Sequence, residues 1–308
     1  MPKDVKRLVQ DVTDLPSMPL VATRIIDLLE DKETTVEQLE EVVVTDQALT
    51  GRLIRLANSA EYAFGRPSAT AREAILLLGF LQVRNIALTA SLTSMFRHRV
   101  TGDSAFDPDL FWSHSLTVAV AAEAVATATR SARRSDAFTA GILHDIGRLL
   151  LRQQFPTEFE QAGRLAMESG MSLEQAEAKL IGYSHDEVGG ALAEQWRFPA
   201  ALVDAIARHH DPRLTIESDR LAGVIAVCDE LVRSEGMLCG FYDPPSQPQR
   251  SPEMEEIVGL MGGMDRVLSN AAWLMEGVVG GKEPPAPLEM RAPVSLRRAR
   301  SLPRARAS

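Results

Sequence analysis

The chain has 308 residues, of which 45% are hydrophobic, 24% charged and 5% aromatic. These values are typical of globular proteins and exclude a chain that is disordered overall. Its two cysteines, Cys228 and Cys239, exclude a disulfide framework and a cysteine-rich zinc module. The N-terminus has no signal-peptide pattern, and the longest apolar runs fall well short of the ~20 residues of a membrane span. We therefore expect a cytoplasmic protein without a membrane partner.

The net charge of −9 is distributed unevenly. Residues 282–308 carry seven Lys or Arg against two Glu, a net charge of +5, which leaves −14 on the rest of the chain. An acidic body repels nucleic acid, so nucleic acid is not an expected partner. The tail at 281–308 is rich in Pro, Ser, Ala and Arg without a sustained helical period, and this composition predicts disorder.

The first half of the chain has helical periodicity throughout. The spacing of apolar residues predicts helices over 20–29, 35–44, 46–58, 70–78 and 81–96. Thr35 and Gln38 have the spacing of a capping box, and Asp46 is a suitable cap for the following helix. The polar segment between 98 and 106 contains a glycine and is the expected boundary between two lobes.

The second half continues in the same way. The predicted helices cover 107–130, 134–151, 155–169, 172–182, 185–194, 199–210, 218–235 and 254–278. The last of these is interrupted at Gly262 and Gly263, and a Pro-rich loop at 241–253 precedes it. No stretch sustains the alternation of a β-strand. The sequence therefore predicts an all-α fold of two packed helical bundles.

Histidine placement is the most informative feature of the sequence. Five of the six histidines lie in or beside predicted helices, and His98 is the exception. His144 and Asp145 are adjacent in the segment GILHDIGR, inside one predicted helix. Neighbouring side chains on a helix point about 100° apart, so both can border one cleft. Gly141 and Gly147 allow another helix or a ligand to approach closely.

Metal sites in helical bundles take their ligands from several helices. The candidate ligands in this chain are His114, His144, Asp145, His185, His209, His210 and Asp229. In our hypothesis a first ion takes His114, His144, Asp145 and Asp229. A second ion, bridged by Asp145, takes His185 with His209 or His210. Nitrogen and oxygen ligands without thiolate favour one or two ions of Fe, Mn, Zn, Co or Ni. The alternative is a hydrogen-bonded polar core without metal.

The order of these residues along the chain resembles the HD superfamily of metal-dependent phosphohydrolases. Longer segments resemble one branch of it, the HDOD family (HD-related output domain), in the right order over about residues 12–212. These segments are LPSMPLVATRIIDLLED, TDQALTGRLIRLANSAEY, AREAILLLGFLQVRNIAL, FWSHS, AFTAGILHDIGRLLL, SHDEVGGALAEQW and RFP. LANSA and the Ala-Ile-x-x-Leu-Gly pattern at 74–79 are the most specific to that family.

The resemblance implies a helical output or regulatory domain of bacterial signalling. We expect a protein that acts by binding a metal or another ligand, for which a nucleotide is a candidate, and by contacting other signalling proteins, rather than by catalysis. The alternative is a metal-dependent phosphohydrolase or phosphodiesterase. In that alternative His144 and Asp145 hold the ion that activates water, and Arg148 or His210 steadies a phosphate.

The segment HHDP at 209–212 and Asp229 also resemble elements of the HD-GYP phosphodiesterases, which hydrolyse cyclic di-GMP. The sequence departs from those enzymes in three places. Arg148 replaces the lysine of their HDIGK motif, DPRLTIESD follows the histidine pair in place of GYP, and Leu110 occupies the position of a further glutamate ligand. Hydrolysis of cyclic di-GMP is therefore not expected.

The resemblance and the helix pattern together predict the domain organisation. The expected units are an HDOD domain at 12–212, with an N-terminal helical lobe at 12–97 and an HD-type lobe at 107–236 that extends past the HDOD match; a helical extension with the Pro-rich loop at 237–280; and the disordered basic tail at 281–308.

The two helices at 36–57 also have the spacing of a helix-turn-helix, which would indicate a transcription factor. The second of them offers only Arg52 and Arg55 as cations, beside a stripe of leucines, and acidic residues precede it. Because DNA binding needs a basic face, we expect this helix to belong to the core.

Overall fold

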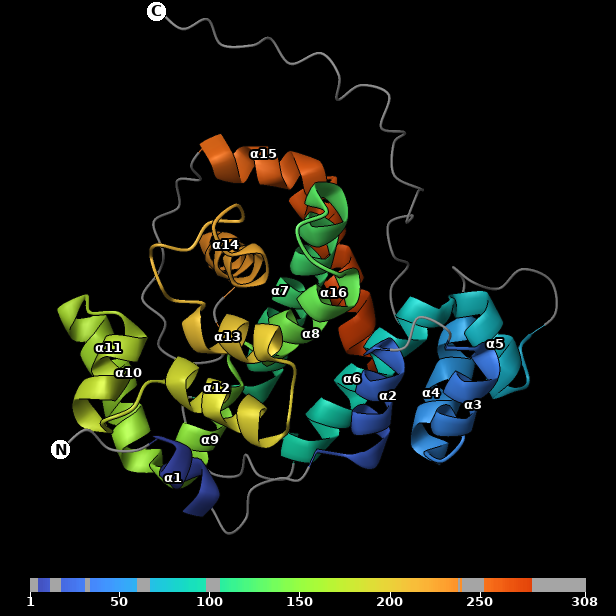
Figure 1. The fold of residues 1–308 in the computed structure, drawn as a ribbon, viewed down its shortest axis with the longest axis horizontal. Helices are drawn as coiled ribbons and strands as arrows, with labels where there is room; N and C mark the ends of the chain where they lie inside the picture. Colours follow the sequence, from blue (N-terminus) through green and yellow to red (C-terminus); the bar gives the residue numbers. More distant parts are fainter. Residues whose placement is uncertain are drawn as a thin grey trace, which may run out of the picture.

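The computed structural model describes residues 5–11, 18–30, 34–59, 67–97, 106–237, 239 and 252–278. Every regular element in these segments is an α-helix, which confirms the predicted all-α fold (Figure 1). In these segments no single helix is long and apolar enough to cross a membrane. One pair, 71–78 with 80–96, meets that criterion only when taken together, and it bends by 114°.

All of the N-terminal helices except the first lie together on the right-hand side of the molecule in Figure 1, and the first lies at the lower left, where it packs on the HD-type half. The N-terminal helices are α1 (Val5–Asp11), α2 (Leu20–Glu30), α3 (Val36–Val43), α4 (Gln47–Ala57), α5 (Ala71–Leu78) and α6 (Phe80–Arg97). The predicted capping box is present, because Thr35 Oγ1 accepts from the Gln38 amide and the Gln38 side chain accepts from the Thr35 amide. Leucines of α4 at positions 49, 53 and 56 are buried, as expected for a core helix rather than a DNA-reading one.

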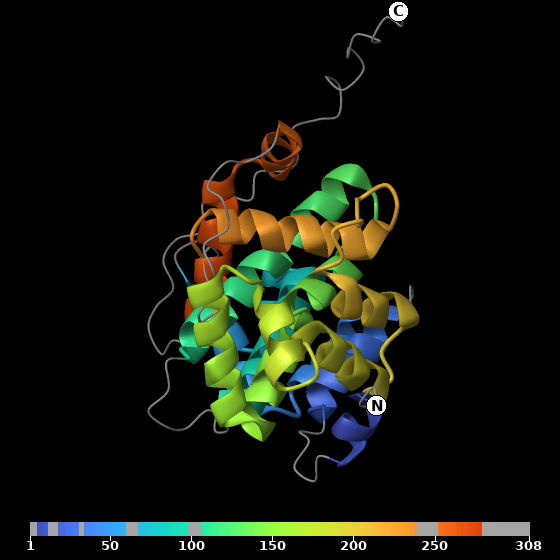
Figure 2. The same ribbon diagram turned by 90° about the vertical axis from the view of Figure 1, so that its left-hand side faces the viewer.

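The HD-type half consists of eight helices that surround a buried polar centre. They are α7 (Pro108–Thr129), α8 (Arg134–Leu143), α9 (Ile146–Gln154), α10 (Pro156–Ser169), α11 (Leu173–Leu180), α12 (His185–Gln195), α13 (Ala200–Arg208) and α14 (Arg220–Ser234). α7 packs along α8 and also contacts α14, whereas α12 contacts α9 and α13. Figures 1 and 2 show α7 and α8 near the middle of the molecule, with α13 and α14 packed against this pair.

One helix, α6, joins the two halves. It packs on α2, α4 and α5 on one side and on α7 and α8 on the other. Arg84 in the second turn of α6 is fully buried, and its guanidinium donates to the Thr139 hydroxyl at 2.7 Å and to the Ser135 carbonyl of α8. Burial lowers the pKa of Arg84 to about 10, so the group still carries its charge at neutral pH.

Segments outside the expected HDOD domain also pack against it. α15 (Pro252–Met261) and α16 (Met264–Val278) follow the Pro-rich loop, and they are separated at Gly262 and Gly263 as predicted. α16 contacts α7, α6 and α4, and Trp273 of α16 is buried, so this extension contributes to the common core. At the other end of the chain α1 packs on α12.

Several predictions concern segments outside the described residues. These are His98, nearly all of the expected lobe boundary at 98–106, most of the Pro-rich loop, and the basic tail at 281–308. They stay predictions. One predicted helix is wrong: the segment expected as a single helix over 134–151 is divided into α8 and α9 by two residues in a turn, His144 and Asp145.

Candidate metal centre

The division between α8 and α9 places the His-Asp pair. His144 ends α8, and Asp145, with φ −96° and ψ 8°, begins α9. The two side chains are therefore not displayed 100° apart on one helix, as the sequence suggested. Instead the turn brings His144 Nε2 to 3.4 Å from Asp145 Oδ2, and both side chains face one buried centre.

Two glycines allow the surrounding backbones to come close enough to form this centre, as expected. A Cβ at Gly147 would lie 2.0 Å from the His185 carbonyl oxygen, and one at Gly141 would lie 2.5 Å from Ala119 Cα of α7. Because real Cβ atoms do not approach other atoms this closely, α9 can contact the start of α12, and α8 can contact α7, only without side chains at these two positions.

The first group of candidate ligands combines α7, the α8–α9 turn and α14. His114 Nε2 lies 3.1 Å from Asp229 Oδ1 and 4.0 Å from Asp145 Oδ2. His144 Nε2 lies 3.6 Å from Asp229 Oδ1. The atoms of His114, His144 and Asp229 all lie within 4.8 Å of one another, a separation that one ion can span.

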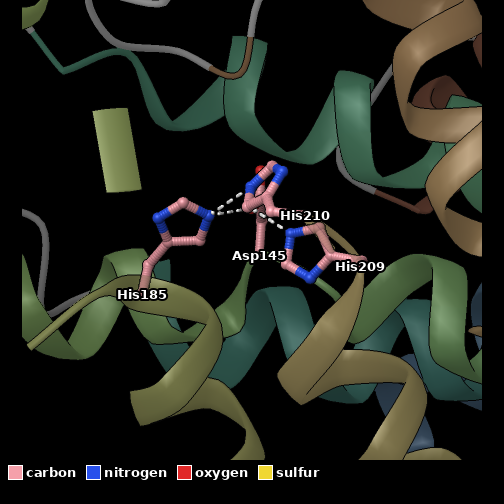
Figure 3. Close-up of side chains that lie close together, drawn as sticks. All are labelled: Asp145, His185, His209 and His210. Carbon is pink, nitrogen blue, oxygen red and sulfur yellow. Dashed lines mark hydrogen bonds and ion pairs between the residues drawn. The ribbon is translucent and has the colours of Figure 1, made fainter. Parts of the chain in front are cut away.

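The second group lies on the other side of Asp145 (Figure 3). His185 at the start of α12 and His209 at the end of α13 place their Nε2 atoms 3.2 Å and 3.5 Å from Asp145 Oδ1. His210 Nε2 lies 2.8 Å from His185 Nε2. One ligand atom from each of these four residues lies within 4.8 Å of the others. Asp145 thus stands between the two groups, with one carboxylate oxygen toward each.

Four histidines direct Nε2 toward the centre. A hydrogen-bond partner at Nδ1 holds each of these rings in that orientation. The Nδ1 atoms of His144 and His209 lie 2.7 Å and 2.8 Å from backbone carbonyl oxygens one turn earlier. His114 Nδ1 lies 2.9 Å from the Met237 carbonyl oxygen, and His185 Nδ1 lies 2.6 Å from a Glu177 carboxylate oxygen. Each oxygen accepts from an Nδ1–H group, and this leaves the Nε2 lone pair directed at the centre, as in metal-ligating histidines.

The charges of the centre act strongly on one another because nearly all of its side chains are buried. Burial alone would lower the pKa of the His144 imidazole, but the carboxylates of Asp145 and Asp229 raise it to about 9. For His185 the carboxylates of Glu177 and Asp145 likewise outweigh burial and raise the pKa to about 10. Although burial would raise them, nearby arginine and histidine side chains hold the pKa values of Asp145 and Asp229 well below the usual range. Protons and a metal ion therefore compete for the same nitrogen atoms.

Arg148 lies inside the centre rather than on the surface. It is 1% exposed, and its Nε lies 3.0 Å from Asp145 Oδ1. This burial excludes a position for Arg148 on the protein surface. Leu110, at the position of the glutamate ligand in the HD-GYP enzymes, is 52% exposed and takes no part in the centre.

The structure brings all seven predicted ligands together and adds three residues that the sequence analysis missed. Glu177 of α11 is fully buried against His185. Arg233 of α14 places Nη2 3.0 Å from Asp229 Oδ2. Cys239, fully buried after α14, donates its thiol to Asp145 Oδ2 at 2.8 Å, so a sulfur atom adjoins the predicted nitrogen and oxygen ligands. None of the three stands in a motif, and the acid in the apolar face of α11 was the one available signal.

A cleft of about 600 Å³ adjoins the centre where His210 reaches the surface. It lies between α11, α12 and the segment after α13. Its charged lining residues are Glu174, Asp186, Glu187, Arg208, Asp211 and Arg213. Both arginines already pair with carboxylates, Arg208 with Asp204 and Asp219 at 3.0 Å and 2.9 Å, and Arg213 with Asp211 at 2.8 Å.

Helices enclosing a buried centre of histidines and aspartates define an HD-type helical domain. The sequence model of the HDOD domain matches residues 15–212, and the chain belongs to the HDOD family.

Proteins of known structure are similar to the chain over most of its length. An HDOD domain protein of unknown function from Geobacter sulfurreducens is 28% identical with a TM-score of 0.68, over 90% of this chain and 88% of that one. A protein from Shewanella amazonensis SB2B, named as a candidate phosphohydrolase, is 24% identical with a TM-score of 0.64, over 88% and 97% of the two chains. This second likeness shows the fold alone.

An uncharacterized protein from Treponema pallidum (strain Nichols) is similar in sequence. It is 22% identical over 224 residues, which cover 72% of this chain and 43% of that protein. The chain therefore spans less than half the length of this curated relative.

Proposed function

We propose that this protein is a cytoplasmic regulatory module of bacterial signal transduction, whose buried His-Asp centre binds a divalent metal ion and which acts through contacts with other signalling proteins. The proposal has two parts. The metal-binding part is supported by the centre itself. The regulatory part is supported by membership of the HDOD family, whose resemblance implies an output domain, and by features that disfavour catalysis.

The observation that carries the metal-binding part is the set of inward-facing Nε2 atoms. His144 Nε2 and His209 Nε2 are buried and have no hydrogen-bond partner, although each lies within 4 Å of a carboxylate oxygen. A buried polar atom without a partner costs about 1–3 kcal/mol, so a centre that contains two of them needs a ligand. A cation bound by imidazole and carboxylate groups satisfies them, and the nitrogen and oxygen donors fit Fe, Mn, Zn, Co or Ni.

Each residue of the centre has a separate task in this proposal. His114, His144 and Asp229 hold the ion in the first group, and Asp145 borders both groups. Carbonyl oxygens and the Glu177 carboxylate orient the imidazoles. A bound ion would supply a concentrated positive charge to a buried cluster of acids. Because the ligands come from α7, the α8–α9 turn and α14, the ion would also link helices that are far apart in the chain.

Two features support binding without turnover. First, the Arg148 guanidinium forms an ion pair with Asp145 Oδ1 at 3.0 Å, and a second metal ion would need this oxygen as a ligand. Second, the adjoining cleft has four acidic residues and two arginines in its lining, and both arginines are already paired with carboxylates. A phosphate group carries negative charge, so a cleft without a spare cation disfavours a phosphoester substrate.

A metal-dependent phosphohydrolase is the second candidate function, and one observation favours it. Asp145 presents Oδ2 to His114 and His144, and Oδ1 to His185 and His209. A carboxylate between two groups of imidazoles is the arrangement of a bridging ligand in two-metal hydrolases.

The metal content of the purified protein tests the proposal. The protein would be produced in medium supplemented with Fe, Mn, Zn, Co and Ni, and its metal measured by mass spectrometry. We expect a stoichiometric ion in the wild type and a loss of most of it in His144→Ala. The matched control is His98→Ala, because His98 is the one histidine outside the predicted ligand set, and it should retain the metal of the wild type.

Activity measurements then separate the two functions. Metal-loaded wild type would be incubated with phosphomonoesters, nucleotides and cyclic dinucleotides, and phosphate and linear products measured. A regulatory module gives no turnover. Product formation that disappears in His144→Ala but persists in His98→Ala would establish the hydrolase instead. A wild type without any stoichiometric metal would refute both candidates in their metal-dependent form.

A further inference from the structure

The segment that follows α14 returns to the candidate metal centre. α14 ends at Ser234, and the Met237 carbonyl oxygen then accepts a hydrogen bond from His114 Nδ1 at 2.9 Å. Two residues later the side chain of Cys239 is fully buried, with Sγ 2.8 Å from Asp145 Oδ2. The segment thus makes contact with the centre at two points, once through its backbone and once through a thiol.

The thiol lies beside one residue of the first group, His114, and beside Asp145. Single atoms of His114, Asp145 and Cys239 are all within 4.8 Å of one another. His114 also belongs to the group with His144 and Asp229, so the two groups share a residue. The unpartnered, fully buried His144 Nε2 lies 3.4 Å from the same Asp145 oxygen that accepts from the thiol. Sulfur, nitrogen and oxygen donors therefore lie close together at His114, Asp145 and Cys239.

We propose that Cys239 is a thiolate ligand of the metal ion bound by His114, His144, Asp145 and Asp229. The proposal rests on the proposed metal binding and adds the identity of one ligand to it. As the metal–sulfur bond forms, the Sγ–H bond breaks and its proton leaves to solvent. The sulfur then faces the cation, and no longer donates to the Asp145 carboxylate.

Local charge is compatible with a thiolate at this position. Ionised Asp145, Asp229 and Cys239 bring three negative charges, and a divalent ion alone leaves one of them uncompensated. Arg148 and Arg233 lie 3.0 Å from oxygens of Asp145 and Asp229 and add two positive charges, and the Glu177 carboxylate beside His185 adds one negative charge, so the charges sum to zero. A buried cluster with balanced charges avoids the large cost of an isolated buried ion.

A sulfur ligand limits both which metals fit the site and which reactions the site can support. Thiolate favours Zn, Fe or Co over Mn and Mg, which prefer oxygen ligands. Catalytic metal sites leave one coordination position open to water or substrate, whereas structural sites fill every position with protein atoms. With Cys239 in place, the first group has five protein ligands. Such a centre is suited to holding helices, or reporting metal status, and not to hydrolysis.

The second cysteine provides a matched control. Cys228 is also fully buried, in the middle of α14, and burial, with a smaller effect of the Asp229 carboxylate, raises the pKa of its thiol. It belongs to no group of candidate ligands among the described residues. Since the chain contains only these two cysteines, any metal–sulfur signal comes from one or the other.

Cobalt substitution tests the proposal, because a thiolate bound to Co²⁺ gives a charge-transfer absorption band in the near ultraviolet. The band should be present in Co²⁺-loaded wild type and Cys228→Ser, and absent from Cys239→Ser. Cobalt content is measured on the same samples, and circular dichroism checks that each variant is folded. In zinc-loaded wild type, X-ray absorption should show a sulfur neighbour at about 2.3 Å, and this reading does not depend on any variant.

The outcomes separate this proposal from the proposed function. Stoichiometric cobalt without the band, or a band that survives in Cys239→Ser, would refute the thiolate ligand and leave metal binding intact. A protein that takes up no cobalt or zinc at all would refute metal binding and the thiolate ligand together. A band lost only in Cys239→Ser, with a sulfur neighbour in the zinc protein, would establish Cys239 as a ligand.

Discussion

At the scale of single residues, the state of each imidazole is decided by the atom next to its Nδ1. Carbonyl oxygens fix His114, His144 and His209, and a carboxylate fixes His185. The carboxylate is the stronger partner, because it also increases the electron density of the ring and thus its strength as a ligand. Glu177 therefore acts on a candidate metal through His185 without touching it, and is a positioning residue.

Replacing Glu177 by Gln should weaken the binding of a metal ion held by the second group, to which His185 belongs. The amide keeps the size of the side chain but removes its charge, and we expect the metal affinity to fall by about 10- to 100-fold. Competition with a chromophoric chelator measures it. The control is Glu174→Gln on the same helix, which contacts the Ser172 hydroxyl rather than a histidine. Equal affinities in the two variants would show that the Glu177 contact serves folding alone.

At the scale of secondary-structure elements, close approach between backbones positions the centre. α9 meets the start of α12 at Gly147, where a Cβ would overlap the His185 carbonyl oxygen at 2.0 Å and the Gly189 amide nitrogen at 2.7 Å. Both of those atoms belong to backbone, and neither can rotate away. The contact between these two helices therefore sets the distance between Asp145 and His185.

The substitution Gly147→Ala should destabilise the fold through this overlap. Overpacking in a well-packed interior costs about 1–3 kcal/mol of unfolding free energy. Because the neighbouring atoms at Gly147 belong to backbone, we expect a loss near the upper end of this range. Urea unfolding followed by circular dichroism measures the loss. Gly51→Ala in α4 is the matched control, because its Cβ would meet nothing within 4 Å. There the lower entropy of the unfolded chain should give a small gain, about 0.5–1 kcal/mol. A Gly147→Ala protein as stable as the wild type would contradict the close approach.

At the scale of the whole molecule, α6 and α16 join the N-terminal helices to the HD-type half. Arg84 is the polar part of this junction, because its guanidinium crosses from α6 to Ser135 and Thr139 of α8. The whole Arg84 side chain is buried, and its guanidinium carbon lies 6.0 Å from the centre of the Phe138 ring. The two halves are therefore connected by hydrogen bonds as well as by apolar packing.

Replacing Arg84 by Met should lower the free energy of unfolding. Methionine preserves the length of the stem but removes every donor, and the loss of buried hydrogen bonds from a charged group costs about 1.5–3 kcal/mol. Thermal and urea unfolding measure the change. Arg72→Met on α5 is the control, since that arginine pairs with Glu37 and Glu40 on the exposed surface and such pairs contribute little. Equal losses of unfolding free energy in the two variants would show that the hydrogen bonds of Arg84 do not stabilise the junction between the two halves.

The sequence determined the helical fold, the family and the seven candidate ligands. It could do so because helical periodicity and caps are local, as at Thr35 and Gln38, and because the order of the HDOD segments is itself a property of the sequence. The prediction of a single helix over 134–151 is wrong for a physical reason. Local propensity continues unbroken through His144 and Asp145, and only packing against α7 and α12 makes the turn between α8 and α9 favourable.

Tertiary structure alone decided which other residues reach the centre. Cys239 meets Asp145 across 94 positions of sequence, and Glu177 meets His185 across a helix end. Arg148 is buried because the charge of Asp145 is buried beside it. No local pattern encodes these contacts, since they depend on how distant helices pack and on which charges they then leave to be compensated.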